Sequence, residues 1–299
     1  MPSPPLASRP QRSPAGLPLG LALGFAVAWS TEARALGPPP SDQHFSIDPV
    51  ADGVFIAAGA GLSGLNELIL STGEIAPQRP GSTGKLLPFD RIAVTQTFDS
   101  TAGPISDAGL GLALAFAVLD PFLSRARDGS DAAIVDAVIY AESLSLTLAL
   151  TDFTKIAVRR PRPVAYIEQE KLDAAYGGAD KSPSISSTDA TLSFFSGHAA
   201  IVAATTATAT YLAFVRSPHS WRPWVTLALG SLLTTFVAYE RVRSGAHFPT
   251  DVVGGALTGG AIGVLVPHTH RHDANGPSVW IGFAPAAGVG GTLTLQGRF

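Results

Sequence analysis

Six long apolar segments between residues 47 and 266 constrain the fold of this chain more than any other feature. They cover roughly residues 47–70, 105–125, 131–158, 196–216, 221–242 and 249–266. Alanine, leucine and small residues dominate each segment, which favours helix over strand. Charged residues make up only 14% of the chain, against about 25% in an average soluble domain, so most of its surface must be hidden from water. The sequence predicts an all-α fold, a six-helix bundle.

The bundle is expected to be embedded in a membrane. A membrane span needs about 20 mostly apolar residues, and segment 196–216 comes closest to this requirement. The third segment is interrupted by Asp136, Glu142 and Asp152, so an exported soluble or peripheral domain is the alternative.

The N-terminal residues 1–40 differ in composition from the body of the chain. They hold nine of the 24 prolines, and Arg9 and Arg12 precede an apolar run over residues 16–29. Residues 33–35, Ala-Arg-Ala, then place small residues at the spacing of a cleavage site. These features predict an export signal or, alternatively, an uncleaved N-terminal anchor with Pro-rich flanks.

The C-terminal residues 273–299 change from helical periodicity to alternation. Apolar and polar residues alternate on both sides of a turn rich in proline and glycine, which predicts a β-hairpin. Residues 41–272 are then the helical domain that carries the chemistry.

Four cations lie between Lys155 and Arg162, at the end of the third apolar segment. Lys155, Arg159 and Arg162 are spaced i, i+4 and i+7, so they would share one face of a helix. Pro161 and Pro163 end the helix and place Arg162 in a loop. A solvated helix end that complements the helix dipole is the alternative role for these charges.

Ser196, Gly197 and His198 stand at the start of the fourth segment. Ser196 is expected to cap the helix, and Gly197 allows the backbone to approach a ligand closely. The N–H groups and positive dipole end of a helix N-terminus favour an anion, and His198 would lie beside it. The alternative is a purely structural histidine.

Arg241, His247 and Asp251 flank the start of the last segment, which Pro249 marks. His247 and Asp251 are four residues apart, so the carboxylate can hold one imidazole nitrogen and leave the other free as a nucleophile. A helix-capping aspartate next to an incidental histidine is the alternative.

Together these residues suit the transfer of a phosphoryl group. Cations and helix amides stabilise its negative charge, one histidine serves as nucleophile and the other as acid. No Asp, Glu and His grouping has the spacing of a magnesium or zinc site, and His268, His270 and His272 are more typical of a solvated tail. The sequence therefore predicts phosphoryl transfer through a histidine, without a metal.

The three motifs resemble the signature of the superfamily of type 2 phosphatidic acid phosphatases, bacterial class A acid phosphatases and vanadium haloperoxidases. That signature is Lys, six residues and Arg-Pro; then Pro-Ser-Gly-His; then Ser-Arg, five residues, His, three residues and Asp. Residues 155–163 match the first part fully, and residues 196–198 match three of the four residues of the second. Residues 241–251 match the third part apart from its leading serine.

The resemblance implies a role for each matching residue. His247 would attack phosphorus and form a phosphohistidine, with Asp251 orienting its ring. His198 would protonate the leaving oxygen and then activate water. The phosphate oxygens would be held by five residues from the three motifs: Lys155, Arg162, Arg241, Ser196 and Gly197. In the family these motifs meet at one end of a helical bundle.

Two residues depart from the family pattern. Phe195 replaces the proline and adds an apolar wall to its loop. Glu240 replaces the leading serine and places a carboxylate beside Arg241, where it would pair with the guanidinium and weaken phosphate binding. Three further arginines lie outside the signature and are expected to support the site or to be surface charges: Arg159, Arg160 and Arg243.

The expected function is a metal-independent phosphatase that hydrolyses a lipid phosphate or a lipid-linked (di)phosphate. The alternatives are a vanadium-dependent haloperoxidase with vanadate as cofactor, a soluble exported acid phosphatase, or a non-catalytic envelope protein. The leading hypothesis needs no cofactor and makes vanadate an inhibitor. The net charge of −3 provides no basic surface for nucleic acid, so the expected partners are the phosphate ester substrate and the membrane.

The expected location is a cell envelope of the bacterial type, with the active site on the extracytoplasmic side. Loops away from the signature carry four arginines, which the positive-inside rule assigns to the cytoplasm: Arg125, Arg127, Arg216 and Arg222. Six spans place both termini on the side opposite the signature. If all six segments span the membrane, an active site on the extracytoplasmic side requires an uncleaved N-terminal anchor. A cleaved signal is instead consistent with an exported soluble or peripheral domain.

Overall fold

The computed structural model describes residues 42, 44–72, 78–271, 278–285 and 291–298. The predicted export signal or anchor over residues 1–40 lies outside these described residues. Within them, side chains are described as far as residue 271.

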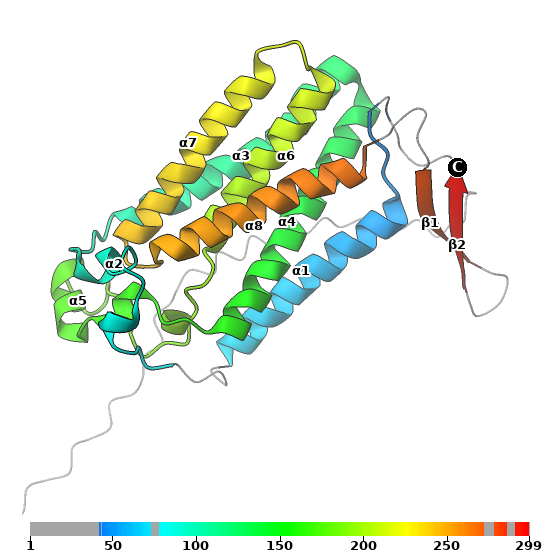
Figure 1. Ribbon diagram of the computed structural model, residues 1–299. Coiled ribbons are helices and arrows are strands. Elements are labelled where there is room, and N and C mark those ends of the chain that lie inside the picture. The colour runs from blue at the N-terminus through cyan, green and yellow to red at the C-terminus, as the bar shows by residue number, and fades with distance from the viewer. Residues whose placement is uncertain (1–41, 43, 73–77, 272–277, 286–290, 299) are drawn as a thin grey trace, which may run out of the picture. The chain divides into compact units, whose positions relative to one another are not determined.

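Long helices make up most of the described chain (Figure 1). They are α1 (Pro49–Ser71), α3 (Ala102–Asp128), α4 (Ser130–Val158), α6 (Gly197–Arg216), α7 (Arg222–Arg243) and α8 (Pro249–Thr269). Each lies within a few residues of a predicted segment, so the prediction of a six-helix bundle is confirmed. Shorter elements fill the connections: the 3-10 turns Thr83–Lys85, Pro163–Tyr166 and Asp189–Thr191, and the helices α2 (Ile92–Thr95) and α5 (Gln169–Tyr176).

Helix α6 lies at the centre of the bundle and packs against α3, α4, α7 and α8. In its most apolar stretch 67% of residues are buried, compared with 6% in α1 and 11% in α7. The outer helices instead expose large apolar side chains, such as Leu65 on α1 and Leu232 on α7. In the described chain, six helices are long and apolar enough to cross a bilayer. The protein is a membrane protein.

Three glycines let α8 approach α6 closely. Gly255, Gly259 and Gly263 are buried and recur at every fourth residue of α8. A Cβ atom at Gly259 would lie 1.9 Å from the carbonyl oxygen of Ala200 on α6, and one at Gly263 would lie 2.4 Å from that of Ala204. Small residues at this spacing allow helix backbones to pack closely in a membrane.

The end of α4 differs from the sequence prediction. The helix stops at Val158, and Arg159 takes the left-handed conformation with φ 52° and ψ 42°. Arg159 and Arg162 therefore do not share a helix face with Lys155, because the chain turns away before it reaches Pro161.

The tail of the chain forms a two-stranded antiparallel sheet. Strand β1 (Ser278–Pro285) pairs with β2 (Gly291–Arg298), with Ser278 opposite Arg298 and Pro285 opposite Gly291. This is the hairpin that the alternation in residues 273–299 predicts.

Candidate active site

The three motifs occupy the same end of the bundle, where α4 and α7 finish and α6 and α8 begin. In Figure 1, α2 and α5 gather at this end. Backbone hydrogen bonds join the motif loops: Ser193 N donates to Arg160 O over 2.9 Å, and Ser196 N donates to Asp251 O over 3.0 Å. Residues distant in the sequence are thereby held in one layer of loops.

Ser196 and Gly197 lie at the N-terminus of α6, as the sequence predicts. Ser196 is the N-cap residue, and its side-chain oxygen accepts a hydrogen bond from Ala199 N at 3.4 Å. A Cβ atom at Gly197 would lie 3.8 Å from Lys155 Nζ and 3.2 Å from Thr151 Cγ2. The absence of a side chain therefore brings the helix amides close to the lysine ammonium group.

His247 is buried, with 2% of its surface exposed. Its Nδ1 lies 2.7 Å from the backbone oxygen of Ser193. A carbonyl oxygen only accepts hydrogen bonds, so Nδ1 carries the proton and Nε2 keeps its lone pair. Burial lowers the pKa of His247 well below 6.5, and the positive charges of Arg162, Arg241 and Lys155 lower this pKa further. The imidazole is thus neutral and nucleophilic at Nε2.

Asp251 acts on His247 indirectly, which differs from the expected direct contact. The distance from Asp251 Oδ2 to His247 Nδ1 is 3.9 Å. The carboxylate instead accepts hydrogen bonds from Ser193 Oγ and from Phe248 N, the latter at 2.8 Å. Asp251 therefore fixes Ser193, and the Ser193 carbonyl fixes the ring of His247.

Arg160 supports this arrangement from the other side of Asp251. Its Nη1 contacts Asp251 Oδ1 at 2.5 Å, and its Nη2 contacts Asp90 Oδ2 at 2.9 Å. Its guanidinium carbon lies 4.0 Å from the centre of the Phe248 ring. Asp90 also accepts a hydrogen bond from Thr250 N at 3.0 Å, which ties the loop before α2 to the start of α8.

His198 has a carboxylate partner that sequence analysis did not identify. Its Nε2 lies 2.8 Å from Asp107 Oδ1 on α3, and Asp107 Oδ1 also lies 3.7 Å from Arg241 Nη1. A carboxylate accepts the proton on Nε2, so Nδ1 is the nitrogen left to exchange a proton with a ligand. Neither Asp107 nor Asp90 belongs to a motif, and the only sequence signal for either is a charge near an apolar helix.

The signature cations are incompletely paired within the described residues. Arg162 is held by Asp189, whose side chain and backbone oxygen lie 2.6 Å and 2.8 Å from it. Arg241 donates from Nη1 to Ser106 Oγ at 3.3 Å, but its buried Nε has no hydrogen-bond partner in the described chain. A buried donor left without an acceptor costs about 1–3 kcal/mol, and an anion would satisfy it.

Glu240 points away from the site, so the expected pairing with Arg241 is wrong. Both carboxylate oxygens of Glu240 accept hydrogen bonds from Arg243 Nη1 at 3.1 Å, and Arg243 also pairs with Asp99. The helix places Glu240 and Arg243 three residues apart on one side and turns Arg241 toward the motifs. Glu240 therefore gives no reason to expect weakened phosphate binding at Arg241.

Phe195 forms part of an apolar wall, as its departure from the family pattern suggests. It is buried, and its ring packs edge-on against Phe194 with the ring centres 5.9 Å apart. Phe194 in turn lies against Gly254, where a Cβ atom would come within 3.2 Å of its ring.

Comparison with known families gives a match to the PAP2 superfamily over residues 136–274. The PAP2 match runs from α4 to the residues after α8 and contains all three motifs. Among curated proteins, none matches the chain.

One solved structure resembles the chain: the transmembrane PAP2 type phosphatidylglycerolphosphate phosphatase of Bacillus subtilis. The two proteins share 18% sequence identity, with a TM-score of 0.40. The similarity covers 73% of this chain and 93% of the other.

Proposed function

We propose that this protein is a membrane phosphatase that hydrolyses a lipid phosphate or lipid-linked (di)phosphate through a phosphohistidine, without a metal cofactor. The observation that carries this proposal is the neutral, buried His247, whose free Nε2 lies among the cations Lys155, Arg162 and Arg241. The PAP2 superfamily match supports phosphatase chemistry at the same residues.

In the first step His247 Nε2 attacks phosphorus. The Nε2–P bond forms, the P–O bond to the leaving group breaks, and His198, entering the step as the imidazolium, gives its Nδ1 proton to the departing oxygen. Lys155, Arg162 and Arg241 hold the equatorial oxygens, where negative charge is spread in the transition state. The open hydrogen-bond capacity of Arg241 Nε suits this role.

In the second step water releases the phosphate. His198, now neutral, accepts a proton from water at Nδ1 while the water oxygen attacks phosphorus. The N–P bond breaks, inorganic phosphate leaves, and both histidines return to their starting states. Asp107 holds His198 at Nε2, which keeps the ring in place through both transfers.

A lipid substrate is supported by an apolar cavity next to the motifs. The cavity has a volume of about 860 Å³ and is lined mainly by apolar residues of α2, α7 and α8 and the loop after α2. Phe98, Tyr239 and Val252 are among these residues, and Val252 follows Asp251 directly in the chain. An acyl or prenyl chain in this cavity would lie beside Arg243 and Pro249, which flank the loop that carries His247.

The test is phosphate release in the presence of EDTA from a panel of lipid and soluble phosphates. Wild type is compared with His247→Ala and with His219→Ala, a control that removes an exposed histidine outside the motifs. We expect lipid turnover by wild type and the control, none by His247→Ala, and an acid-labile phosphoprotein after rapid quenching. Turnover that needs Mg²⁺, or that survives in His247→Ala, would contradict the mechanism. Turnover of soluble esters alone would contradict the substrate class.

A further inference from the structure

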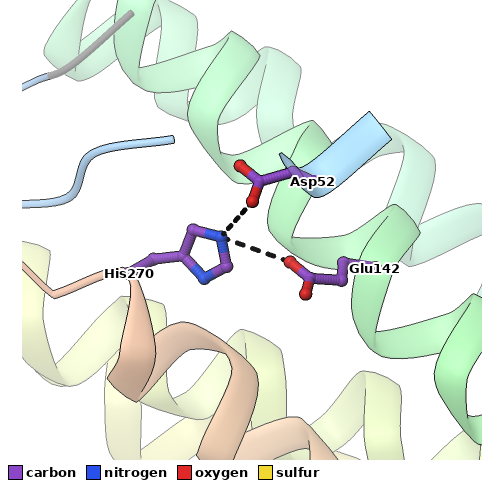
Figure 2. A group of neighbouring side chains, drawn as sticks. All are labelled: Asp52, Glu142 and His270. Atoms are coloured by element: carbon purple, nitrogen blue, oxygen red, sulfur yellow. Dashed lines mark ion pairs between the residues drawn. The ribbon is translucent and has the colours of Figure 1, made fainter. Parts of the chain in front are cut away.

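A second group of titratable side chains, drawn in Figure 2, lies far from the PAP2 motifs. It consists of Asp52 from the first turn of α1, Glu142 from α4, and His270 directly after α8. His270 follows Asp251 by 19 positions, which is about 28 Å along a helix at 1.5 Å per residue, so the group is remote from the phosphate site. The proposed phosphatase mechanism uses none of its members.

The spacing of the three side chains fits one small cation. His270 Nε2 lies 3.4 Å from Asp52 Oδ1 and 3.2 Å from Glu142 Oε2, and the possible ligand atoms all lie within 4.8 Å of one another. Ligands around a tetrahedral ion with bonds of about 2.0–2.1 Å are about 3.3 Å apart, by simple geometry. The two contacts of His270 are close to this value, and they lie at and just beyond the upper end of the usual hydrogen-bond range.

The ring of His270 is oriented as in metal-binding histidines. Its Nδ1 lies 2.8 Å from the backbone oxygen of Val266, which only accepts hydrogen bonds, so Nδ1 carries the proton. Nε2 is then the nitrogen that faces both carboxylates, as Figure 2 shows. A backbone carbonyl on the second ring nitrogen is the usual support of a ligating imidazole.

The carboxylates supply a second, independent indication of a missing ligand. Glu142 is only 7% exposed, and its Oε2, which faces His270, is buried without a hydrogen-bond partner among the described residues. The other oxygen of Asp52, Oδ2, accepts a hydrogen bond from Asp48 N at 2.8 Å, so Oδ1 is presented to the group. Two buried carboxylates that face one imidazole nitrogen carry a charge that a divalent cation would balance.

We propose that Asp52, Glu142 and His270 form a binding site for Zn²⁺. One nitrogen and two oxygen ligands suit zinc, with water in the fourth position, whereas Mg²⁺ and Ca²⁺ need six or more oxygen ligands. The sequence indicated no metal site because the neighbours of His270 in the chain, His268 and His272, do not form one with it. The partners of His270 come from α1 and α4 and are brought to it only by folding.

The proposed ion would cross-link α1, the least buried of the six long helices, to the rest of the bundle. Helix α1 packs mainly against α4, and it carries only Asp52 of the three ligands. The chain before α1 reaches the same place, since Ser46 N donates to His270 O at 3.0 Å and Phe45 forms a β-bridge with Arg271. Zinc would therefore join α1, α4 and the end of α8 into one unit.

The experiment measures zinc uptake by the full-length protein, purified in detergent with a tag that contains no histidine. The protein is stripped with EDTA, incubated with Zn²⁺ alone, freed of excess metal and analysed by mass spectrometry for zinc per chain. We expect one zinc ion per chain and a higher melting temperature with zinc than without. Cobalt in place of zinc is expected to give the strong visible absorption of a tetrahedral site.

Variants assign the uptake to these residues. Glu142→Gln keeps the size of the side chain and is expected to weaken zinc binding at least tenfold. His268→Ala, which removes an exposed histidine two residues from His270, and His247→Ala, at the phosphate site, are expected to bind zinc as wild type does. No uptake by wild type would overturn the proposal and leave a protonated His270 bridging the carboxylates. Undiminished uptake by Glu142→Gln, or its loss in either control, would overturn the assignment equally.

Discussion

The close approach of α6 and α8 at Gly259 provides the sharpest test of the packing. In Gly259→Ala the new Cβ atom would lie 1.9 Å from the oxygen and 2.6 Å from the carbon of the Ala200 carbonyl. These are backbone atoms, so no side chain can rotate away, and the helices must separate by about 1 Å or more. Overpacking costs about 1–3 kcal/mol, while alanine gains up to about 1 kcal/mol over glycine in a helix. Because the clash is with backbone atoms, the cost should lie at the upper end of this range, and we expect a net loss of about 2 kcal/mol in the free energy of unfolding.

Gly260→Ala is the matched control, because nothing lies within 4 Å of a Cβ atom at the next residue. It makes the same chemical change in the same helix and is expected to leave stability equal or slightly higher. Unfolding in mixed detergent micelles, titrated with a denaturing detergent, measures both. Gly259→Ala should also lower turnover, because Ser196 N bonds to Asp251 O across the two helices at 3.0 Å. Equal stability of the two variants would refute the inferred packing.

Three further predictions concern the site. In Arg160→Lys the lysine can reach only one of the two carboxylates, Asp90 and Asp251, that the arginine contacts. In steady-state assays kcat should therefore fall about tenfold with KM nearly unchanged. A change confined to KM would contradict a positioning role for Arg160. Glu240→Ser restores the family residue but removes one of the two carboxylate partners of Arg243, so the free energy of unfolding should fall by about 1 kcal/mol. Inhibition by phosphate should stay within about twofold of wild type. Tighter inhibition would argue against the Glu240–Arg243 pairing. The pKa of His247 is lower in the folded chain than in the unfolded chain, so as the pH falls the unfolded chain takes up a proton on this imidazole before the folded chain does. The free energy of unfolding should therefore fall as the pH drops below about 6.5. Thermal unfolding of His247→Gln should depend less on pH in this range.

The helices and the motifs were open to prediction because both depend on local order in the sequence. Each long helix follows from an uninterrupted run of apolar and small residues between loop-forming residues. Ser196 was expected to cap α6, and Pro249 to begin α8, and the structure has both. The order and intervals of Lys155, Arg162 and the later motif residues were likewise sufficient to indicate the superfamily.

The supporting contacts of the site were not predictable from spacing. Arg160 meets Asp90 from a loop 70 residues earlier, and His198 meets Asp107 from a helix 91 residues earlier. Neither carboxylate has a neighbour in the sequence that marks it as functional. The expected contact between Asp251 and His247 has the correct spacing, but hydrogen bonds from Ser193 and Phe248 draw the carboxylate away from the ring.

The sequence by itself determined which segments become helices and where the motif residues lie at the helix ends, because local propensity, capping and motif order are properties of neighbouring residues. Only the tertiary structure decided which partner each charged group takes. Glu240 turns to Arg243 rather than Arg241, and Asp52, Glu142 and His270 converge from three separate helices or helix ends. A buried charge pairs with whatever polar group the packing of helices brings within reach, and distance along the chain does not specify that group.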